Sequence, residues 1–247
     1  MLCGRDGAMV RRGLGRVGRI ACVVVLVVGV GGVGCVELAY RTVLHGIPTT
    51  PEVPSTQVVA PLERTLWGYL DGTSTPEMRP IYPWRVALWI GRAIVGEPSV
   101  LPGFNIAGTV ASMHLQSLGR SSRELTAHFR GFSLIIWVSR HLSASQAVSY
   151  WATRVRGPRG SSGLYEASRL LFGESPDRIR MSQLALLLAV SWNPDRNDPW
   201  CHPERISELR TRALDQLVRA GVLSETDRST AERERLALLE RECSQVR

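Results

Sequence analysis

The sequence predicts a mainly α-helical domain that follows a single N-terminal transmembrane helix. Apolar residues recur with helical spacing from residue 62 onward, and the alternating pattern of strands is scarce. A run without any charged residue precedes that region, from Ile20 to Val36. The 247 residues are 44% apolar and 21% charged. This composition is typical of a globular protein and excludes the disordered, collagen-like and small disulfide-rich classes.

The uncharged run has the features of a membrane anchor. As a helix its seventeen residues span about 25 Å, the low end for crossing a bilayer, and the residues up to Tyr40 can extend it. Arginines precede it, so the positive-inside rule places residues 1–19 in the cytoplasm, residues 20–40 in the membrane and the rest outside. A cleaved signal peptide is the alternative, and Gly32-Val33-Gly34 before Cys35 resembles a lipoprotein cleavage box only loosely.

Residues 41–61 are expected to form an extended linker, because four prolines interrupt them. A domain over residues 62–223 follows. Its first half is predicted to contain a loop at 99–108 and helices at 62–70, 84–95 and 109–118.

The second half of the domain shows the clearest helical periodicity. Ser143 is predicted to cap the N-terminus of one helix, and residues 182–190 are so uniformly apolar that their helix should be enclosed on most sides. A glycine-rich loop is expected at 156–163, and a C-terminal helix over 224–247, starting at Glu225. The remaining predicted helices cover 122–141, 144–155, 164–172, 182–190 and 203–220.

Charge and residue content exclude several kinds of chemistry. The net charge of +8 lies half in the first nineteen residues and is otherwise spread out, which disfavours a nucleic-acid binder. No lysine is present, so no lysine amine takes part in any reaction. The five histidines lack metal-ligand spacing, and no metal site is expected. Cys201 and Cys243 are free to pair in an oxidising compartment, but their spacing does not require it.

Four segments in the second half carry a resemblance to a known family. In order and spacing they are similar to the peptidoglycan glycosyltransferases of family 51, the glycan-polymerising domains of class A penicillin-binding proteins and their monofunctional relatives. Fainter matches upstream extend the resemblance to about residues 62–222. The four segments are Ala167–Glu174, Met181–Ala189, Asn193–Pro199 and His202–Arg205. The simplest interpretation of their individual side chains remains packing, with Arg205, Arg210 and Arg212 on a solvated helix face.

The resemblance implies a lysozyme-like, two-lobed fold with a cleft beside the membrane, and lipid II or a glycan strand as ligand. Glu77 falls on the family's catalytic base, although Met78 and Trp84 replace the acidic and histidine partners. Gly131 falls on the second family carboxylate, and His128 falls on a family lysine.

The same alignment gives Arg92, Arg123 and His128 as the expected substrate-binding residues. A divalent cation such as magnesium is the expected cofactor if the protein is active.

Two functions therefore remain open. The first is a membrane-bound peptidoglycan glycosyltransferase with Glu77 as base. The second is a catalytically inactive pseudo-glycosyltransferase that binds glycan or other cell-wall synthesis proteins as a scaffold. A glycan-cleaving, lysozyme-like enzyme is a third hypothesis, with less support from the sequence. All three place a single-pass protein in the inner membrane, with its domain in the periplasm or outside the cell.

Overall fold

The computed structural model describes residues 31–86, 96, 101–119, 125–240 and 242–243. These residues are mainly helical, and their one β-type contact is an isolated antiparallel bridge between Arg156 and Ser162. The chain divides into two compact units, one of residues 1–46 with 82–98 and one of residues 47–81 with 99–247.

The smaller unit contains a helix over residues 31–45, with an ion pair of 3.2 Å between Arg41 Nε and Glu37 Oε1. Within the described residues, none of the helices combines the length and apolar character that a membrane crossing requires. Residues 20–30 of the predicted span lie outside the described residues, as do residues 87–95 of the helix predicted at 84–95.

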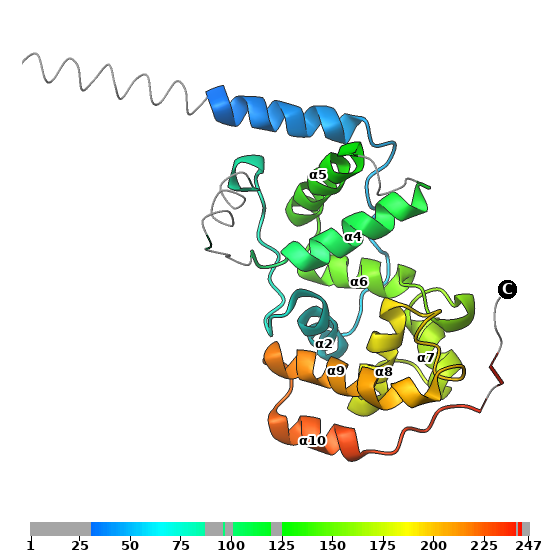
Figure 1. The fold of residues 1–247 in the computed structure, drawn as a ribbon. Helices are drawn as coiled ribbons and strands as arrows, with labels where there is room; N and C mark the ends of the chain where they lie inside the picture. The colour runs from blue at the N-terminus through cyan, green and yellow to red at the C-terminus, as the bar shows by residue number, and fades with distance from the viewer. Residues whose placement is uncertain (1–30, 87–95, 97–100, 120–124, 241, 244–247) are drawn as a thin grey trace, which may run out of the picture. The chain divides into compact units, whose positions relative to one another are not determined.

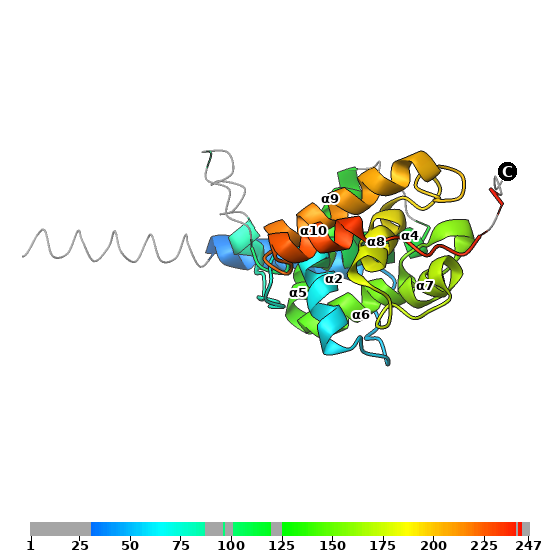
Figure 2. The ribbon, with the colours of Figure 1, turned by 90° about the horizontal axis from the view of Figure 1, so that it is seen from below.

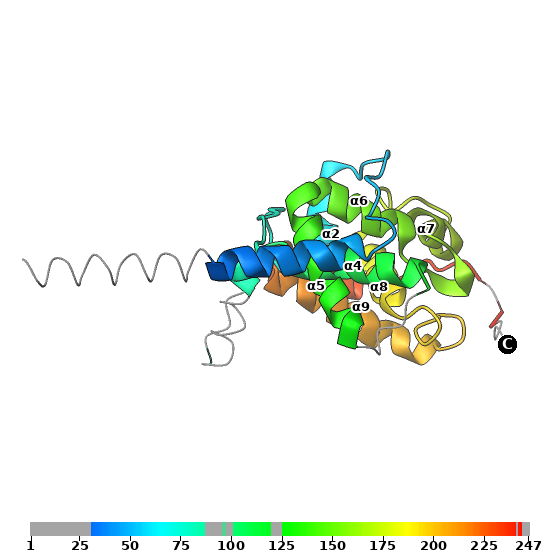
Figure 3. The ribbon, with the colours of Figure 1, turned by 90° about the horizontal axis from the view of Figure 1, so that it is seen from above.

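The larger unit consists of helices packed on one another, as the sequence predicts (Figures 1, 2 and 3). Its described α-helices are α2 (Ala60–Asp71), α4 (Phe104–Ser117), α5 (Leu125–His141), α6 (Ala144–Arg154), α7 (Leu164–Phe172), α8 (Met181–Trp192), α9 (Ile206–Arg219) and α10 (Glu225–Arg233). Two short 3-10 helices, η1 (Pro158–Gly160) and η2 (Pro203–Arg205), lie in the connections.

Helix α8 lies inside this unit, as its apolar sequence predicts. Leu186, Leu187 and Leu188 are consecutive in the chain, so their side chains point in three directions around the helix, and all three are fully buried. Helices α7 and α9 both pack against α8. The core therefore surrounds α8 instead of covering a single face.

The prediction of a loop at 99–108 is wrong over its second half, because α4 already begins at Phe104. The early start of α4 depends on Asp71, which lies at the end of α2 and is only 2% exposed. Its carboxylate accepts the backbone N–H groups of Gly103 and Asn105 at 3.0 and 3.2 Å. A side chain distant in sequence thus satisfies N–H groups that the helix start leaves unpaired.

The prediction of a helix from Glu225 to the C-terminus is also wrong, because α10 ends at Arg233. Residues 234–240 and 242–243, called here the C-terminal strap, run without helix along the unit. Leu236 and Leu238 pack on the core while Ala237 and Leu239 are exposed, and this alternation is typical of extended chain.

Polar contacts hold the strap in place. The N–H of Leu239 donates to the carbonyl of Leu171 at 2.9 Å, and the indole of Trp200 donates to the carbonyl of Leu239 at 2.8 Å. A disulfide joins Cys201 to Cys243 across a sequence separation of 42. The pairing that the sequence left open is thus present, and it closes the strap onto the chain just before η2.

Of the linker expected at 41–61, residues 47–59 are non-helical and belong to the larger unit, whereas residues 41–45 are helical and residues 60–61 begin α2. Ile47 and Val58 are buried, and the N–H of Val58 donates to Ser149 Oγ at 3.0 Å. The ring of His114 forms a hydrogen bond of 2.8 Å with the carbonyl of Thr49.

Ser143 caps α6 as the sequence predicts. Its hydroxyl accepts the N–H of Gln146 at 3.2 Å, and the Gln146 side chain accepts the N–H of Ser143 at 2.8 Å. We expect Ser143→Ala to lower the free energy of unfolding by about 1 kcal/mol, because one N–H at the helix start loses its acceptor. Urea titration measures the loss. Ser145→Ala is the control. Ser145 is the second residue of α6, and replacing it should change the free energy of unfolding by less.

Candidate functional site

Glu77, the predicted base, lies in the connection between α2 and α4. Its side chain is 49% exposed and forms an ion pair with Arg79, whose Nε and Nη2 donate at 2.8 and 3.2 Å. These hydrogen bonds lower the pKa of Glu77 below its ordinary value. A general base works best with a pKa near the working pH, so the pairing weakens Glu77 as a proton acceptor.

Of the other predicted site residues, the structure describes only His128, and it also describes Gly131, the position of the second family carboxylate. His128 is exposed on the first turns of α5, and no hydrogen bond or ion pair joins it to Glu77 in the described part of the chain. Gly131 lies on the same helix, and a Cβ added there would meet no atom of the described residues within 4 Å, apart from its chain neighbours and the backbone of its own helix. Arg92 and Arg123 lie outside the described residues.

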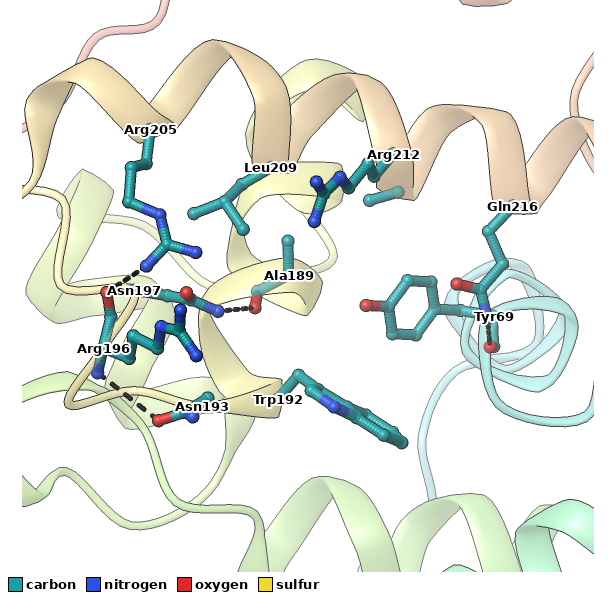
Figure 4. A pocket seen from close by; sticks show the side chains of 11 residues that line it. Tyr69, Ala189, Trp192, Asn193, Arg196, Asn197, Arg205, Leu209, Arg212 and Gln216 are labelled. Carbon is teal, nitrogen blue, oxygen red and sulfur yellow. Dashed lines mark hydrogen bonds between the residues drawn. The ribbon is translucent and has the colours of Figure 1, made fainter.

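A pocket of about 540 Å³ opens elsewhere in the larger unit, between α2, α8, η2 and α9 (Figure 4). Glu77 and His128, the predicted site residues that the structure describes, do not line it. The lining residues are Tyr69, Ala189, Trp192, Asn193, Arg196, Asn197, Arg205, Leu209, Arg212, Ala213 and Gln216.

The loop after α8 forms one wall of the pocket, and hydrogen bonds fix its shape. The buried Asn197 donates from Nδ2 to the carbonyl of Ala189 at 3.0 Å, which ties the loop to the last turns of α8. The N–H of Arg196 lies 3.4 Å from Asn193 Oδ1. Arg205 Nη1 donates to the carbonyl of Arg196 at 2.8 Å and so joins the loop to η2 (Figure 4).

Helix α9 forms the opposite wall. Its Gln216 donates to the backbone carbonyl of Tyr69, which joins α9 to the end of α2. Arg212 forms an ion pair with Glu208 one turn earlier on the helix. The guanidinium of Arg196 has no hydrogen-bond or ion-pair partner among the described residues, so it is free to meet a ligand.

The pocket combines positive charge with aromatic surface. Three arginines line it and no carboxylate does. Trp192 is 74% exposed, the most exposed large apolar side chain in the described part of the chain. Burial raises the pKa of Tyr69 to about 12, so its hydroxyl stays protonated at neutral pH and is able to donate a hydrogen bond. This arrangement suits an anionic ligand with a ring that stacks on indole.

Sequence reasoning did not find this pocket. The sequence predicts Arg205, Arg210 and Arg212 on a solvated helix face. Arg212 is indeed 67% exposed, and it lines the pocket with Arg205 and Arg196. Arg210 is instead half-buried and donates to the backbone carbonyls of Glu232 and Glu234. One signal was available, because Asn193, Arg196 and Arg205 belong to the segments that carry the family resemblance. Tyr69 offered none, since it comes from a helix more than a hundred residues away.

The described side chains form no cluster of the usual metal ligands. Within residues 31–86, 96, 101–119, 125–240 and 242–243, no three His, Cys, Asp or Glu side chains are grouped closely enough to hold a metal ion. We therefore assign no step to such an ion.

Comparison with known proteins confirms the resemblance over part of the chain. Residues 108–218 match the family described as Transglycosylase, and every pocket residue except Tyr69 lies within this range. Penicillin-binding protein 1A of Streptococcus pneumoniae (strain ATCC BAA-255 / R6) is 25% identical over 91 residues, 37% of this chain and 13% of that protein. Penicillin-binding protein 1A of Streptococcus oralis is 24% identical over 109 residues, 44% and 16% of the two lengths. The chain thus spans less than a fifth of the length of these relatives.

Proposed function

From the Transglycosylase segment at residues 108–218, we propose that this is a peptidoglycan glycosyltransferase-like protein of the cell envelope. It binds lipid II or polymerised glycan, and it has little or no polymerising activity of its own. The observation that carries this proposal is the state of Glu77, which is exposed and held by Arg79.

Glycan polymerisation needs a base that takes the proton from the acceptor hydroxyl, and positive charge that stabilises the departing pyrophosphate. Glu77 is a poor base because its hydrogen bonds with Arg79 lower its pKa. The position of the second family carboxylate is Gly131, and the open space around it holds no other described side chain. Losing these charged groups slows turnover by orders of magnitude, since each contact contributes about 1.5–3 kcal/mol.

Binding is expected to survive the loss of catalysis. The helices that carry the family motifs are packed into the core, and they shape an arginine-lined pocket. A folded protein with a ligand pocket, whose Glu77 is held by Arg79, is suited to hold glycan, or to act as a scaffold for other cell-wall synthesis proteins.

The proposal includes a membrane anchor at residues 20–40 and a domain outside the cytoplasm. The uncharged run with arginines before it supports the anchor and its direction. The Cys201–Cys243 disulfide supports the outside location, because such bonds persist in oxidising compartments and are rare in the cytosol.

A lipid II polymerisation assay tests the absence of catalysis. Purified full-length protein in detergent, supplied with magnesium, is expected to form no more polymer than a protein-free blank. The nearly isosteric Glu77→Gln variant is expected to behave like the wild type. An active class A penicillin-binding protein serves as positive control. Robust polymerisation by the wild type that Glu77→Gln abolishes would restore the enzyme function and overturn the proposal.

Binding is tested separately by co-sedimentation with purified peptidoglycan. The full-length protein is expected to sediment with peptidoglycan and to stay in the supernatant with cellulose, a neutral glycan control. Equal recovery in both supernatants contradicts the proposed glycan binding.

A further inference from the structure

We propose that the pocket between α2, α8, η2 and α9, called here the α8–α9 pocket, binds a sugar that carries an anionic substituent, either a phosphate or a carboxylate. This inference rests on the proposed glycan binding and names the chemical group that the protein recognises. It concerns a site whose lining includes neither Glu77 nor His128.

The charge of the pocket selects an anion. Arg196, Arg205 and Arg212 line it, and the lining includes no aspartate or glutamate. Glu208, the acidic partner of Arg212, lies on α9 outside the lining. Guanidinium groups bind phosphate and carboxylate through paired, charge-assisted hydrogen bonds. Arg196 is best placed for this, because no described side chain or carbonyl occupies its guanidinium.

The aromatic lining selects a ring. Trp192 ends α8 and leaves 74% of its surface exposed, so its indole face is accessible to a ligand in the pocket. An indole face covers the apolar C–H face of a sugar ring, while polar groups bind its hydroxyls. The Tyr69 hydroxyl and the Asn193 side chain lie on the pocket wall with Trp192 (Figure 4).

The size of the pocket and the hydrogen bonds within its wall also suit a small polar ligand. Its volume of about 540 Å³ lies within the range of about 300–1,000 Å³ that is common for small-molecule sites. The bonds from Asn197 to Ala189 and from Arg205 to Arg196 hold the arginine-bearing loop before any ligand arrives. A preorganised wall reduces the entropy lost on binding.

Isothermal titration calorimetry on the full-length protein in detergent tests the inference with four probes. These are N-acetylglucosamine 1-phosphate, N-acetylmuramic acid, N-acetylglucosamine and inorganic phosphate. We expect at least one anionic sugar to bind about tenfold or more tightly than both the neutral sugar and free phosphate. Tighter binding of N-acetylglucosamine 1-phosphate identifies phosphate as the recognised group, and tighter binding of N-acetylmuramic acid identifies carboxylate. Equal affinity for all four, or no binding of any, overturns the inference.

Variants locate the binding. Arg196→Gln and Trp192→Ala are each expected to weaken binding of the preferred anionic sugar about tenfold, without changing Tm, because both side chains are exposed. The matched controls are Arg219→Gln, an exposed arginine of α9 outside the pocket, and Phe129→Ala, an exposed aromatic on α5. Both should bind like the wild type. Wild-type affinity in Arg196→Gln and Trp192→Ala overturns the inference.

Co-sedimentation with peptidoglycan separates the two proposals. If the α8–α9 pocket fails these tests while the protein still sediments with peptidoglycan, the pocket assignment is wrong and the proposed function stands. If peptidoglycan is not bound either, both are wrong.

Discussion

Replacing Leu187 by aspartate is expected to prevent the larger unit from folding. Leu187 is fully buried on α8, the helix around which the core is packed. A carboxylate there would have no partner and no water, and burying such a charge costs several kcal/mol even after its pKa shifts. That loss is comparable with the whole stability of a domain, about 5–15 kcal/mol. Far-UV circular dichroism and the yield of soluble protein measure the effect.

Val59→Asp is the control for this experiment, because it also changes an apolar residue to aspartate. Val59 is 50% exposed and occupies the N-cap of α2, where its side chain makes no capping hydrogen bond. Aspartate is a favoured N-cap residue, so this variant should fold and be at least as stable as the wild type. A Leu187→Asp protein with wild-type helicity and Tm would show that α8 does not lie in the core.

Removing the disulfide is expected to cause the second large loss of stability. The Cys201–Cys243 bond closes a loop with a sequence separation of 42, and the chain-entropy model gives such a loop about 4 kcal/mol of stabilisation. We expect the double variant Cys201→Ser, Cys243→Ser to lose about this much free energy of unfolding. Guanidinium titration measures it, and dithiothreitol should bring the wild type to the same midpoint.

Cys35→Ser is the matched control, because Cys35 is exposed and unpaired in the described structure. It should unfold at the wild-type midpoint. Alkylation in intact cells extends the test to location: two thiols of the wild-type chain should react only after reduction if the domain is exported. Full reactivity without reduction would contradict both the bond and the proposed location.

Elements with local signals could be predicted from the sequence. The helix predicted at 164–172 is α7, and Ser143 caps α6, because glycine or serine at the ends of these helices marks them within a few residues. The enclosure of α8 follows from its uniform apolar sequence. In each case the residues that determine the structure lie inside or next to the element.

Elements fixed by distant residues could not be predicted. Helix α4 starts early because of Asp71, and α10 ends early because the strap gains contacts with Leu171 and Cys201. The α8–α9 pocket needs Tyr69 beside Gln216, a pairing that no local pattern shows. The ion pair of Glu77 depends on where Arg79 points, which sequence spacing leaves undecided.

The disulfide-closed strap also determines how the protein bears mechanical load. Tension applied to the chain beyond Cys243 passes through the sulfur bridge directly to Cys201. The segment between these cysteines contains η2, α9 and α10, and it carries none of that tension while the bridge is intact. Arg205 and Arg212 belong to this unloaded segment. Pulling on the C-terminal side would therefore leave the α9 wall of the pocket in place until the bridge is reduced.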